Sequence, residues 1–472
     1  MFNIVILTSR KNYTWKSMEE IIPFIEFSWS QLKAPDVNVE TIFIEETSLS
    51  DLLKKAISAS HIVLTCFTPE IFRATKFIRF EMKLDVHLIV HLHNQSTISC
   101  WPIRFWGDSY LFLESDIFIS SCSRDKECLF LTYPKATSYV VPFSYKEYRK
   151  KYLIPLLPTA DEIPLFYIGR LSSQKNLHTL ILSLDLLKRH FPLIKWKMSF
   201  YGEEDFLGSP NMGWRDRNYK ELLINLVNSL KLSDDIQFYG QVDRAILNKN
   251  LSSNKGIFIS PSLHSDENFG MAAFKALTTG HLAVLSDWGG HFDFKKSFND
   301  TVNLTPVYQT PNGPFISPSD LCLCIIDSLK SYSTNYSKKI PAQYSIEDIS
   351  SKYRQILNDS KTFLKVKSQT LQPSKLSNDI LEKAKFSLNT KSFKIFSDYS
   401  DPLSHSFFQA YGMKHKLPIF DCSNKVSLPP WITRSHLEVT INDPHRGSFV
   451  FNSNTENSTF INDGFAYLSD FR

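Results

Sequence analysis

Two polar segments that each follow a predicted strand carry residue types suited to binding an anion. In the first, the strand ends at Gly169, and Arg170 and Lys175 follow just before a predicted helix. The free N–H groups and positive dipole at a helix start attract anions, and an arginine can hold a phosphate through two hydrogen bonds. These residues favour a diphosphate site, although a strand-to-helix turn with solvated charges has the same composition.

The second segment starts at His264 and opens another predicted helix near Gly270. A glycine there allows a ligand to approach the backbone closely. Glu267 lies at the mouth of this helix, where its carboxylate could accept hydrogen bonds from sugar hydroxyls or simply neutralise the helix dipole. Because a glycine pair, Gly289 and Gly290, follows the next predicted strand, the segments together predict a binding site for a phosphate-bearing ligand.

The elements that must position these segments alternate between short apolar runs and helical patterns. This alternation predicts a parallel sheet covered by helices, and it restarts after a proline-containing linker at residues 151–164. We therefore expect two α/β halves with a ligand site in the cleft between them. The expected strands are residues 3–7, 40–44, 61–66, 87–92, 117–120, 139–141, 165–169, 195–201, 236–239, 256–260 and 282–286, and the clearest helices are 52–58, 177–187, 219–230 and 345–357.

Two stretches do not follow this alternation. Residues 205–217 contain Gly and Pro without periodicity, so we expect a surface insertion. Beyond about residue 366 the composition shifts toward Ser, Asn and Thr, with strand-like alternation at 437–441 and 448–451. We interpret this C-terminal part as a small separate module or a partly ordered extension.

The composition narrows the class of protein. A chain of 472 residues is too long for a single core and predicts two or three domains. A net charge of +5 is too small to indicate a nucleic-acid-binding protein. The seven cysteines form no CxxC pair, which favours free thiols in a reducing compartment. Because the sequence shows neither a signal peptide nor a run of about 18 apolar residues, we expect a cytoplasmic protein.

Helical spacing over residues 71–83 also places four basic residues in one stripe. Basic residues beside aromatic ones can bind an anionic membrane surface, which would place the protein at the inner face of the membrane. The other interpretation is the solvated face of an ordinary core helix. The four residues are Arg73, Lys76, Arg79 and Lys83.

In their order, spacing and sheet context, the two polar segments resemble the retaining glycosyltransferases of family 4 (glycosyl transferases group 1), which have the two-domain GT-B fold. The resemblance is strong over residues 163–295, weaker over 1–160 and absent after about 366. Its matching elements are Gly-Arg-Leu at 169–171 with Lys175, Tyr-Gly at 239–240, Ser-Pro-Ser at 260–262, Glu-Asn-Phe-Gly-Met at 267–271, Phe-Lys-Ala-Leu at 274–277 and Ser-Asp-Trp-Gly-Gly at 286–290.

The resemblance implies a role for each polar residue. Arg170 and Lys175 would hold the diphosphate of a nucleotide sugar, such as a UDP- or GDP-sugar, and Glu267 would contact the sugar as a catalytic residue. His93, at the end of a predicted strand, would be a second catalytic residue facing the sugar; its alternative is a structural, hydrogen-bonded role. No metal ion or other cofactor is implied. The other donor-binding positions are Gly169, Asn268, Phe269, Gly270, Met271, Lys275, Gly289 and Gly290.

The sequence departs from the family pattern at three places. Lys275 stands where family members usually carry a second Glu, and a lysine cannot accept a hydrogen bond as a carboxylate does. The loop at residues 8–13 lacks the glycines of many members, and Pro-Phe-Ser-Tyr at 142–145 replaces their Pro-Asn-Gly turn. The last two changes fall on the acceptor side, so a glycan, a lipid-linked molecule and a protein all stay open as acceptors.

The sequence therefore predicts an α/β protein of the GT-B fold, in which two Rossmann-like domains face each other across a cleft. The expected activity is metal-independent, retaining transfer of a hexosyl group in polysaccharide or glycoconjugate biosynthesis. One alternative is a non-catalytic GT-B partner subunit, which Lys275 favours; another is a GT-B sugar phosphorylase or nucleotide-sugar epimerase, which the helix start at Glu267 disfavours. The expected domains are an acceptor domain at 1–158, a donor domain at 159–345, a closing helix at 346–365 and an extension of unknown role at 366–472.

Overall fold

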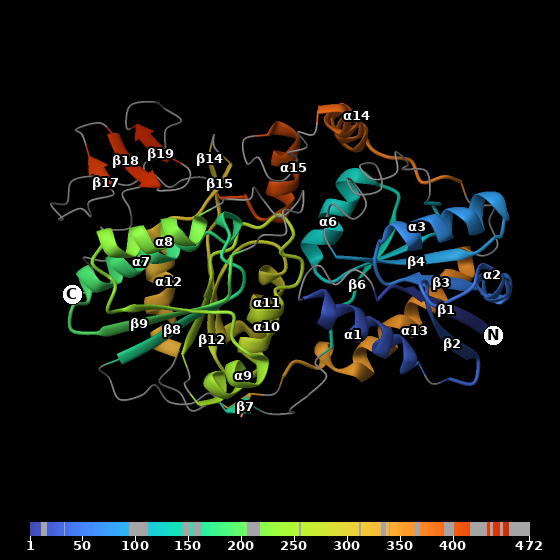
Figure 1. Ribbon diagram of the computed structural model, residues 1–472, viewed down its shortest axis with the longest axis horizontal. Helices are drawn as coiled ribbons and strands as arrows, with labels where there is room; N and C mark the ends of the chain where they lie inside the picture. Colours follow the sequence, from blue (N-terminus) through green and yellow to red (C-terminus); the bar gives the residue numbers. More distant parts are fainter. Residues whose placement is uncertain are drawn as a thin grey trace. The chain divides into compact units, whose positions relative to one another are not determined.

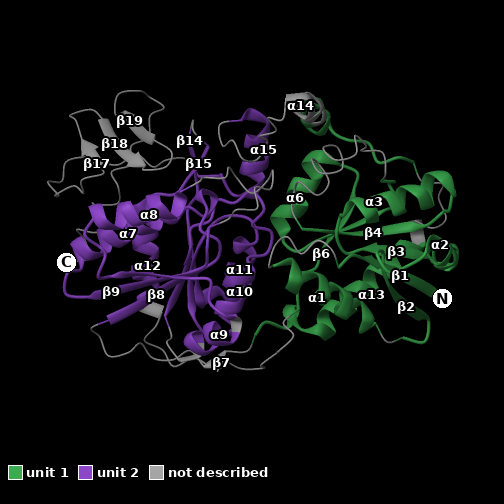
Figure 2. Ribbon diagram, in the orientation of Figure 1, with its two compact units in different colours: residues 1–149, 340–395 green, residues 150–339, 396–472 purple. Residues whose placement is uncertain are grey.

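The structure is a computed structural model, and its chain divides into two compact units (Figure 2). Unit 1 comprises residues 1–149 and 340–395, and unit 2 comprises residues 150–339 and 396–472. The expected insertion at 205–217 and most of the expected linker at 151–164 lie outside the described residues. These described residues are 1–10, 17–32, 34–93, 112–144, 152–153, 162–204, 218–253, 256–310, 313–331, 337–338, 340–363, 369–390, 401–415, 432–434, 438–443 and 447–452.

Unit 1 is built on six parallel strands in the order β2-β1-β3-β4-β5-β6 (Figure 1). Every residue of β3, β4 and β5 is buried, as expected for parallel strands that are covered on both faces. Each of the six overlaps a strand expected from the sequence. Their bounds are β1 Phe2–Thr8, β2 Val37–Phe43, β3 His61–Leu64, β4 His87–Leu92, β5 Ile117–Ser120 and β6 Thr137–Val140.

The core of unit 1 includes a helix from far along the chain, α13 (Ile346–Phe363). Its Tyr353 ring stacks on Trp29 of α1 (Met18–Ser30), with 4.1 Å between the ring centroids. Both side chains are buried, so α13 completes the cover of the unit 1 sheet. The other helices of unit 1 are α2 Leu49–Ser58, α3 Pro69–Lys76, the π-helix η1 Phe77–Glu81, α6 Ser123–Thr132, the 3-10 helix η4 Ala342–Tyr344 and α14 Lys375–Thr390.

The basic stripe expected over residues 71–83 is divided in the structure. Three of its residues are exposed, but Arg79 is buried and forms an ion pair with Asp116. The α-helix ends at Lys76 and continues as a π-helix, whose wider turn changes which side chains face inward. Both sequence interpretations were therefore wrong for Arg79, whose guanidinium also donates to the carbonyl of Val86 at 3.0 Å inside unit 1.

Unit 2 contains a second sheet of six parallel strands, in the order β10-β9-β8-β11-β12-β13 (Figure 1). If the six strands are numbered by their order in the chain, the sheet reads 3-2-1-4-5-6, which is the order of the Rossmann fold. The direction of this order reverses between β8 and β11. Sheets of this kind bind ligands at the carboxyl ends of the strands beside such a reversal. The strands are β8 Glu162–Ile168, β9 Lys195–Tyr201, β10 Ile236–Gly240, β11 Ile257–Ser260, β12 Leu282–Ser286 and β13 Val302–Thr305.

The longest helices of unit 2 pack against one another beside this sheet. Helix α7 (Leu177–His190) is buried from Leu177 to Leu187, and it contacts both α8 (Tyr219–Ser229) and α12 (Pro318–Ser331). The helices of this part of unit 2 are η2 Ser173–Lys175, α7 Leu177–His190, α8 Tyr219–Ser229, α9 Arg244–Ser253, α10 Met271–Thr278, α11 His291–Phe298, η3 Asn299–Thr301 and α12 Pro318–Ser331. Two short two-stranded sheets complete it. One pairs β7 (Tyr152–Leu153) with β16 (Ser337–Lys338), and the other pairs β14 (Tyr308–Thr310) with β15 (Gly313–Phe315).

The C-terminal residues return to unit 2 after the segment that belongs to unit 1. Helix α15 (Pro402–Tyr411) is capped by Asp401, whose carboxylate accepts the N–H of Leu403 at 3.1 Å. Three antiparallel strands follow, and the last two overlap the strands expected at 437–441 and 448–451. Their bounds are β17 Ile432–Arg434, β18 Glu438–Asp443 and β19 Gly447–Asn452.

Within the part of the chain that the structure describes, no helix combines the length and the apolar character needed to cross a bilayer.

Candidate functional site

The loop that follows β8 brings Arg170 to the carboxyl end of the unit 2 sheet. Tyr167 of β8 donates its hydroxyl to the carbonyl of Arg170 at 2.9 Å, and this hydrogen bond holds the loop against β8. Gly202 follows β9, and a Cβ at this position would lie 1.8 Å from the carbonyl oxygen of Gly169. The loops after β8 and β9 therefore meet backbone to backbone, and only glycine permits this approach.

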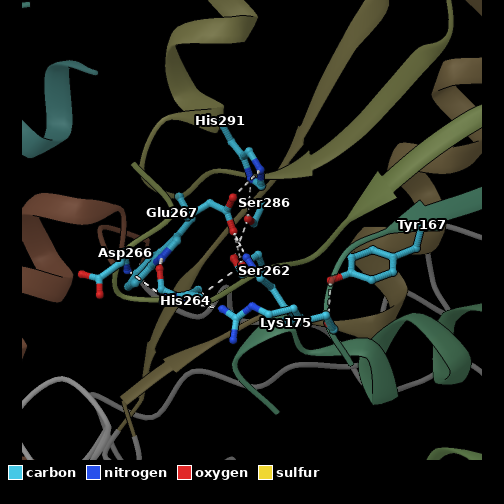
Figure 3. Close-up of polar contacts among 10 residues, drawn as sticks. Tyr167, Lys175, Ser262, His264, Asp266, Glu267, Ser286 and His291 are labelled. Carbon is cyan, nitrogen blue, oxygen red and sulfur yellow. Dashed lines mark hydrogen bonds and ion pairs between the residues drawn. The ribbon is translucent and has the colours of Figure 1, made fainter. Parts of the chain in front are cut away.

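Lys175 and Glu267 form a buried ion pair at the same edge of the sheet (Figure 3). Their side chains are 15% and 11% exposed. Ser262, which follows β11, donates its hydroxyl to the same carboxylate oxygen of Glu267 at 2.7 Å. The structure thus joins the two segments singled out in the sequence, one after β8 and one after β11.

Burial and charge act in opposite directions on this pair. Burial raises the pKa of Glu267, but the charge of Lys175 in the ion pair outweighs it and holds the pKa well below its usual range. Burial lowers the pKa of Lys175, against the attraction of the carboxylate. Glu267 is therefore a carboxylate at neutral pH, and it can accept hydrogen bonds but not donate them.

His264 and Arg170 present two hydrogen-bond donors to each other. The Nδ1 of His264 accepts the backbone N–H of Asp266 at 2.9 Å, so a neutral ring carries its proton on Nε2. Burial and the neighbouring cations hold the pKa of His264 well below its usual value, so the ring is neutral. Its Nε2 lies 3.1 Å from an Arg170 Nη atom, and two converging N–H groups are satisfied by an anion that bridges them.

His291 and Ser286 lie beside Glu267 and contact each other (Figure 3). Ser286 donates its hydroxyl to the carbonyl of Ser262 at 2.7 Å, and its oxygen can therefore accept from His291 Nδ1, which lies 3.1 Å away. The other ring nitrogen of His291 is 3.8 Å from Glu267, too far for a hydrogen bond. These two residues order the loop that carries Glu267.

The helix expected near Gly270 begins at Met271, the first residue of α10. Gly270 has a φ of 79°, and a Cβ there would lie 2.9 Å from the ring of His291. The Phe269 ring is buried against Phe274, so only the backbone of this residue can face a ligand. At Phe269 and Gly270 the turn therefore offers its backbone rather than a side chain.

The glycine pair after β12 holds two loops together. Gly289 donates its N–H to the carbonyl of Tyr411 at 2.9 Å, and Gly290 donates to the carbonyl of Glu267 at 2.8 Å. A Cβ would lie 2.3 Å from the Glu267 oxygen at the first position and 2.4 Å from the Asn268 oxygen at the second. Close packing accounts for both glycines, and donor binding by them stays a prediction.

Three other expected donor-binding residues, Gly169, Asn268 and Lys275, are half-exposed in unit 2. Gly169 donates its N–H to the carbonyl of Tyr201 at 2.9 Å, within the sheet. Lys275 lies on α10, and its carbonyl accepts the N–H of Thr279 at 3.0 Å. Their roles toward a donor stay predictions.

His93 lies in unit 1, directly after β4. Its Nε2 is 2.5 Å from the carbonyl oxygen of Thr65, and the ring is buried. Burial lowers its pKa, although the Thr65 carbonyl opposes the shift, so the ring is neutral at physiological pH with its proton on Nε2. The carbonyl contact fits the structural alternative, and it also sets the tautomer that a catalytic histidine would need.

Sequence reasoning missed three residues that line this site: Ser262, His264 and His291. For Ser262, the Ser-Pro-Ser pattern at 260–262 was a signal in the sequence that could have identified it. The two histidines carried no signal, because their importance arises from contacts with residues distant in the chain. No group of three His, Cys, Asp or Glu side chains that could hold a metal ion occurs among the residues that the structure describes.

Comparison with known proteins found one family model and several similar solved structures. A family model described as "Glycosyl transferases group 1" matches residues 149–304. No curated protein matches the sequence. A glycosyltransferase from Rickettsia africae ESF-5 has a TM-score of 0.50 at 14% identity, covering 76% of this chain and 98% of its own. HepE (Alr3699) of Anabaena, solved in complex with UDP, has a TM-score of 0.49 at 15% identity, covering 76% of this chain and 100% of its own.

The residues matched by the family model contain the whole cluster around Glu267, from the loop after β8 to the glycine pair after β12. The likeness to the Rickettsia protein concerns the fold, which in both units is a parallel α/β sheet. The chain therefore has the GT-B fold, and its residues 149–304 carry the pattern of the group 1 glycosyltransferases.

Proposed function

We propose that the protein is a glycosyltransferase that moves a hexosyl group from a nucleotide-diphosphate sugar to a hydroxyl of an acceptor. One observation carries the proposal. Arg170, Lys175 and Glu267 come from two segments far apart in the chain, and they meet at the carboxyl ends of β8 and β11, where the strand order of unit 2 reverses.

The cations of this site fit the leaving group. When the bond between the anomeric carbon and the diphosphate breaks, the diphosphate takes the electron pair and gains negative charge. Arg170 and the Nε2–H of His264 supply donors for that charge, and Lys175 adds a buried cation. Because these groups neutralise the charge, the proposed reaction is independent of a metal ion.

The carboxylate of Glu267 fits the sugar. It is ionised, buried and held by Ser262 and Lys175, so its position is fixed before a ligand arrives. A carboxylate in this state accepts hydrogen bonds from sugar hydroxyls, and hydroxyl recognition of this kind fixes the orientation of the anomeric carbon. In unit 1, His93 is the residue that we propose faces the donor sugar.

Several finer points belong to the same proposal. Retention of the anomeric configuration and membership of family 4 follow from the resemblance of the sequence motifs. UDP- and GDP-sugars are the proposed donors, and the acceptor is a glycan, a lipid or a protein. We place the protein in the cytoplasm, because the five described cysteines are free thiols, as is usual in a reducing compartment.

A donor screen tests the proposal. Purified protein is incubated with a panel of UDP- and GDP-sugars, and release of the nucleotide diphosphate is measured. Arg170→Ala should lower the rate about 10²-fold, as removal of one stabilising donor does in other enzymes. Arg189→Ala is the matched control. Arg189 forms an ion pair with Asp185 one turn earlier on α7, so its loss should leave the rate unchanged. Equal rates for the two variants would place the chemistry elsewhere.

Lys275 favours a second candidate, a non-catalytic GT-B partner subunit. A lysine at this position of α10 cannot accept a hydrogen bond from a ribose hydroxyl as a carboxylate would. This candidate predicts no release of nucleotide diphosphate and no thermal stabilisation by any nucleotide sugar. Release from any donor in the panel would contradict it.

A further inference from the structure

The segment 401–415, which follows the part of the chain that belongs to unit 1, packs on the loop after β12. We propose that this segment is a positioning element of the donor site, and that Tyr411 acts through the loop to hold Glu267 and His264 in place. The inference rests on the proposed function, because it assigns the segment to the same site.

Backbone hydrogen bonds link α15 to the site. The carbonyl of Tyr411 accepts the N–H of Gly289 at 2.9 Å, and the next N–H, from Gly290, is donated to the carbonyl of Glu267 at 2.8 Å. Trp288 donates its indole N–H to the carbonyl of His264 at 2.7 Å. The loop after β12 is thus hydrogen-bonded to the loop after β11 at both His264 and Glu267, and it also contacts α15.

Packing allows little movement in this arrangement. Trp288 is fully buried, and its ring lies 5.3 Å from the Tyr411 ring and 5.8 Å from the Phe408 ring, centroid to centroid. A Cβ on Gly289 would lie 2.7 Å from the Tyr411 ring and 2.3 Å from the carbonyl oxygen of Glu267. Gly289 therefore lies between α15 and the loop after β11 with no room for a side chain.

The end of the segment is tied to unit 2 by a second set of contacts. His415 Nε2 lies 3.2 Å from a carboxylate oxygen of Asp287, and its carbonyl accepts the N–H of Gln309, from β14, at 3.0 Å. Met413 is fully buried between the two sets of contacts. Figure 1 shows α15 beside β14 and β15, and α15 and β15 are in contact. The segment is thus anchored on both sides of the Gly289 contact.

Hydrogen exchange tests the inference without a donor. The full-length protein and its Tyr411→Leu variant are compared by the exchange of peptides that span residues 262–271 and 286–292. Loss of the Tyr411 ring should speed exchange of both peptides about tenfold through local opening. The control is Trp196→Leu, which removes another buried aromatic side chain of unit 2, on β9. It should leave both peptides unchanged, and Tyr411→Phe should behave as the wild type.

Equal exchange in Tyr411→Leu and Trp196→Leu would overturn the inference. If Tyr411→Leu does not fold, Phe408→Leu replaces it, since Phe408 supports the same Trp288 ring. The second readout is kinetic and uses the nucleotide sugar that the donor screen selects. Tyr411→Leu should raise the KM for that donor about tenfold with the acceptor KM unchanged, and Trp196→Leu should alter neither. Absence of any active donor would refute the proposed function, and the exchange result would still decide the role of α15.

Discussion

Glu267 is the residue on which the electrostatics of the site depend. Its carboxylate is almost out of water, and it is stable as an anion because Lys175 pairs with it and Ser262 donates a hydrogen bond to it. Removing one partner of such a buried pair leaves the other charge uncompensated. The site is therefore organised around a fixed anion with cations on one side, and it can orient a neutral sugar and neutralise a diphosphate at the same time.

The acid dependence of stability should show this arrangement. The pKa of Glu267 is lower in the folded protein than in the unfolded chain, so its contribution is complete above the unfolded value of about 4.3 and is lost as the pH falls below it. Glu267→Gln should cost about 3 kcal/mol of unfolding free energy at pH 7. Urea unfolding at pH 7 and pH 3 should show this difference shrinking at the lower pH. A difference of the same size at both values would contradict the depressed pKa.

Lys275 can be tested by restoring the acid that its position usually carries. Lys275 is half-exposed on α10, so Lys275→Glu should change stability by no more than about 0.5 kcal/mol. A carboxylate there could accept a bond from a ribose hydroxyl, and one such bond should lower the donor KM about fivefold. Steady-state kinetics with the donor found in the screen measure this change. An unchanged KM would mean that position 275 does not reach the nucleotide.

At this scale the sequence was most informative about charged residues. Arg170, Lys175 and Glu267 could be singled out because their types are unusual beside glycines at helix starts, and the structure brings them together. His264 and His291 could not, because a buried histidine acquires its role from neighbours that only the folded chain supplies. Gly289 and Gly290 were assigned to the ligand, and in the structure they also serve the packing of two loops.

The loops after β8 and β9 position Arg170 through a backbone contact. Gly202→Ala would place a methyl group 1.8 Å from the Gly169 carbonyl oxygen, in a backbone conformation with a φ of 142°. We expect a loss of about 2–3 kcal/mol in unfolding free energy, and a larger loss of donor turnover than stability alone explains. Thermal unfolding and nucleotide-diphosphate release measure the two effects. The control is Lys197→Ala, because Lys197 lies on β9 and its side chain is half-exposed. If Gly202→Ala and Lys197→Ala had equal turnover, the role of this backbone contact would be contradicted.

Among the elements, parallel strands were predicted best. Buried parallel strands read as short apolar runs, and all the strands expected in the two main sheets occur. The helix expected at 71–83 was predicted less well, because the pattern assumed an α-helical period throughout. Its π-helical end at Phe77–Glu81 turned Arg79 inward to Asp116.

At the scale of the whole molecule, the chain passes from unit 1 to unit 2 and back before it ends in unit 2. The helical pattern at 345–357 predicted a helix, but an amphipathic stripe does not say which sheet it covers. Tyr353 gives the answer through its stacking on Trp29 of unit 1. In the same way, the composition after residue 366 gave no sign that α15 would pack beside the site.

This discontinuity predicts which fragments fold. Residues 1–149 alone lack α13, whose Ile349, Tyr353 and Leu357 are buried in unit 1, so the fragment should expose Trp29 and unfold or aggregate. The same fragment joined to residues 340–395 by a short Gly/Ser linker should give a cooperative thermal transition by circular dichroism. A stable fold of residues 1–149 alone would contradict the structural role of α13.

The central claim is that the cluster around Glu267 is a sugar-transfer site. The most direct measurement compares kcat/KM for release of the nucleotide diphosphate between the wild type and Glu267→Gln, with the donor that the screen selects. The two side chains have nearly the same shape, so the comparison isolates the charge. We predict a loss of about 10²-fold in the variant, as for removal of a single transition-state contact. Equal values for the two proteins would contradict the assignment of this site.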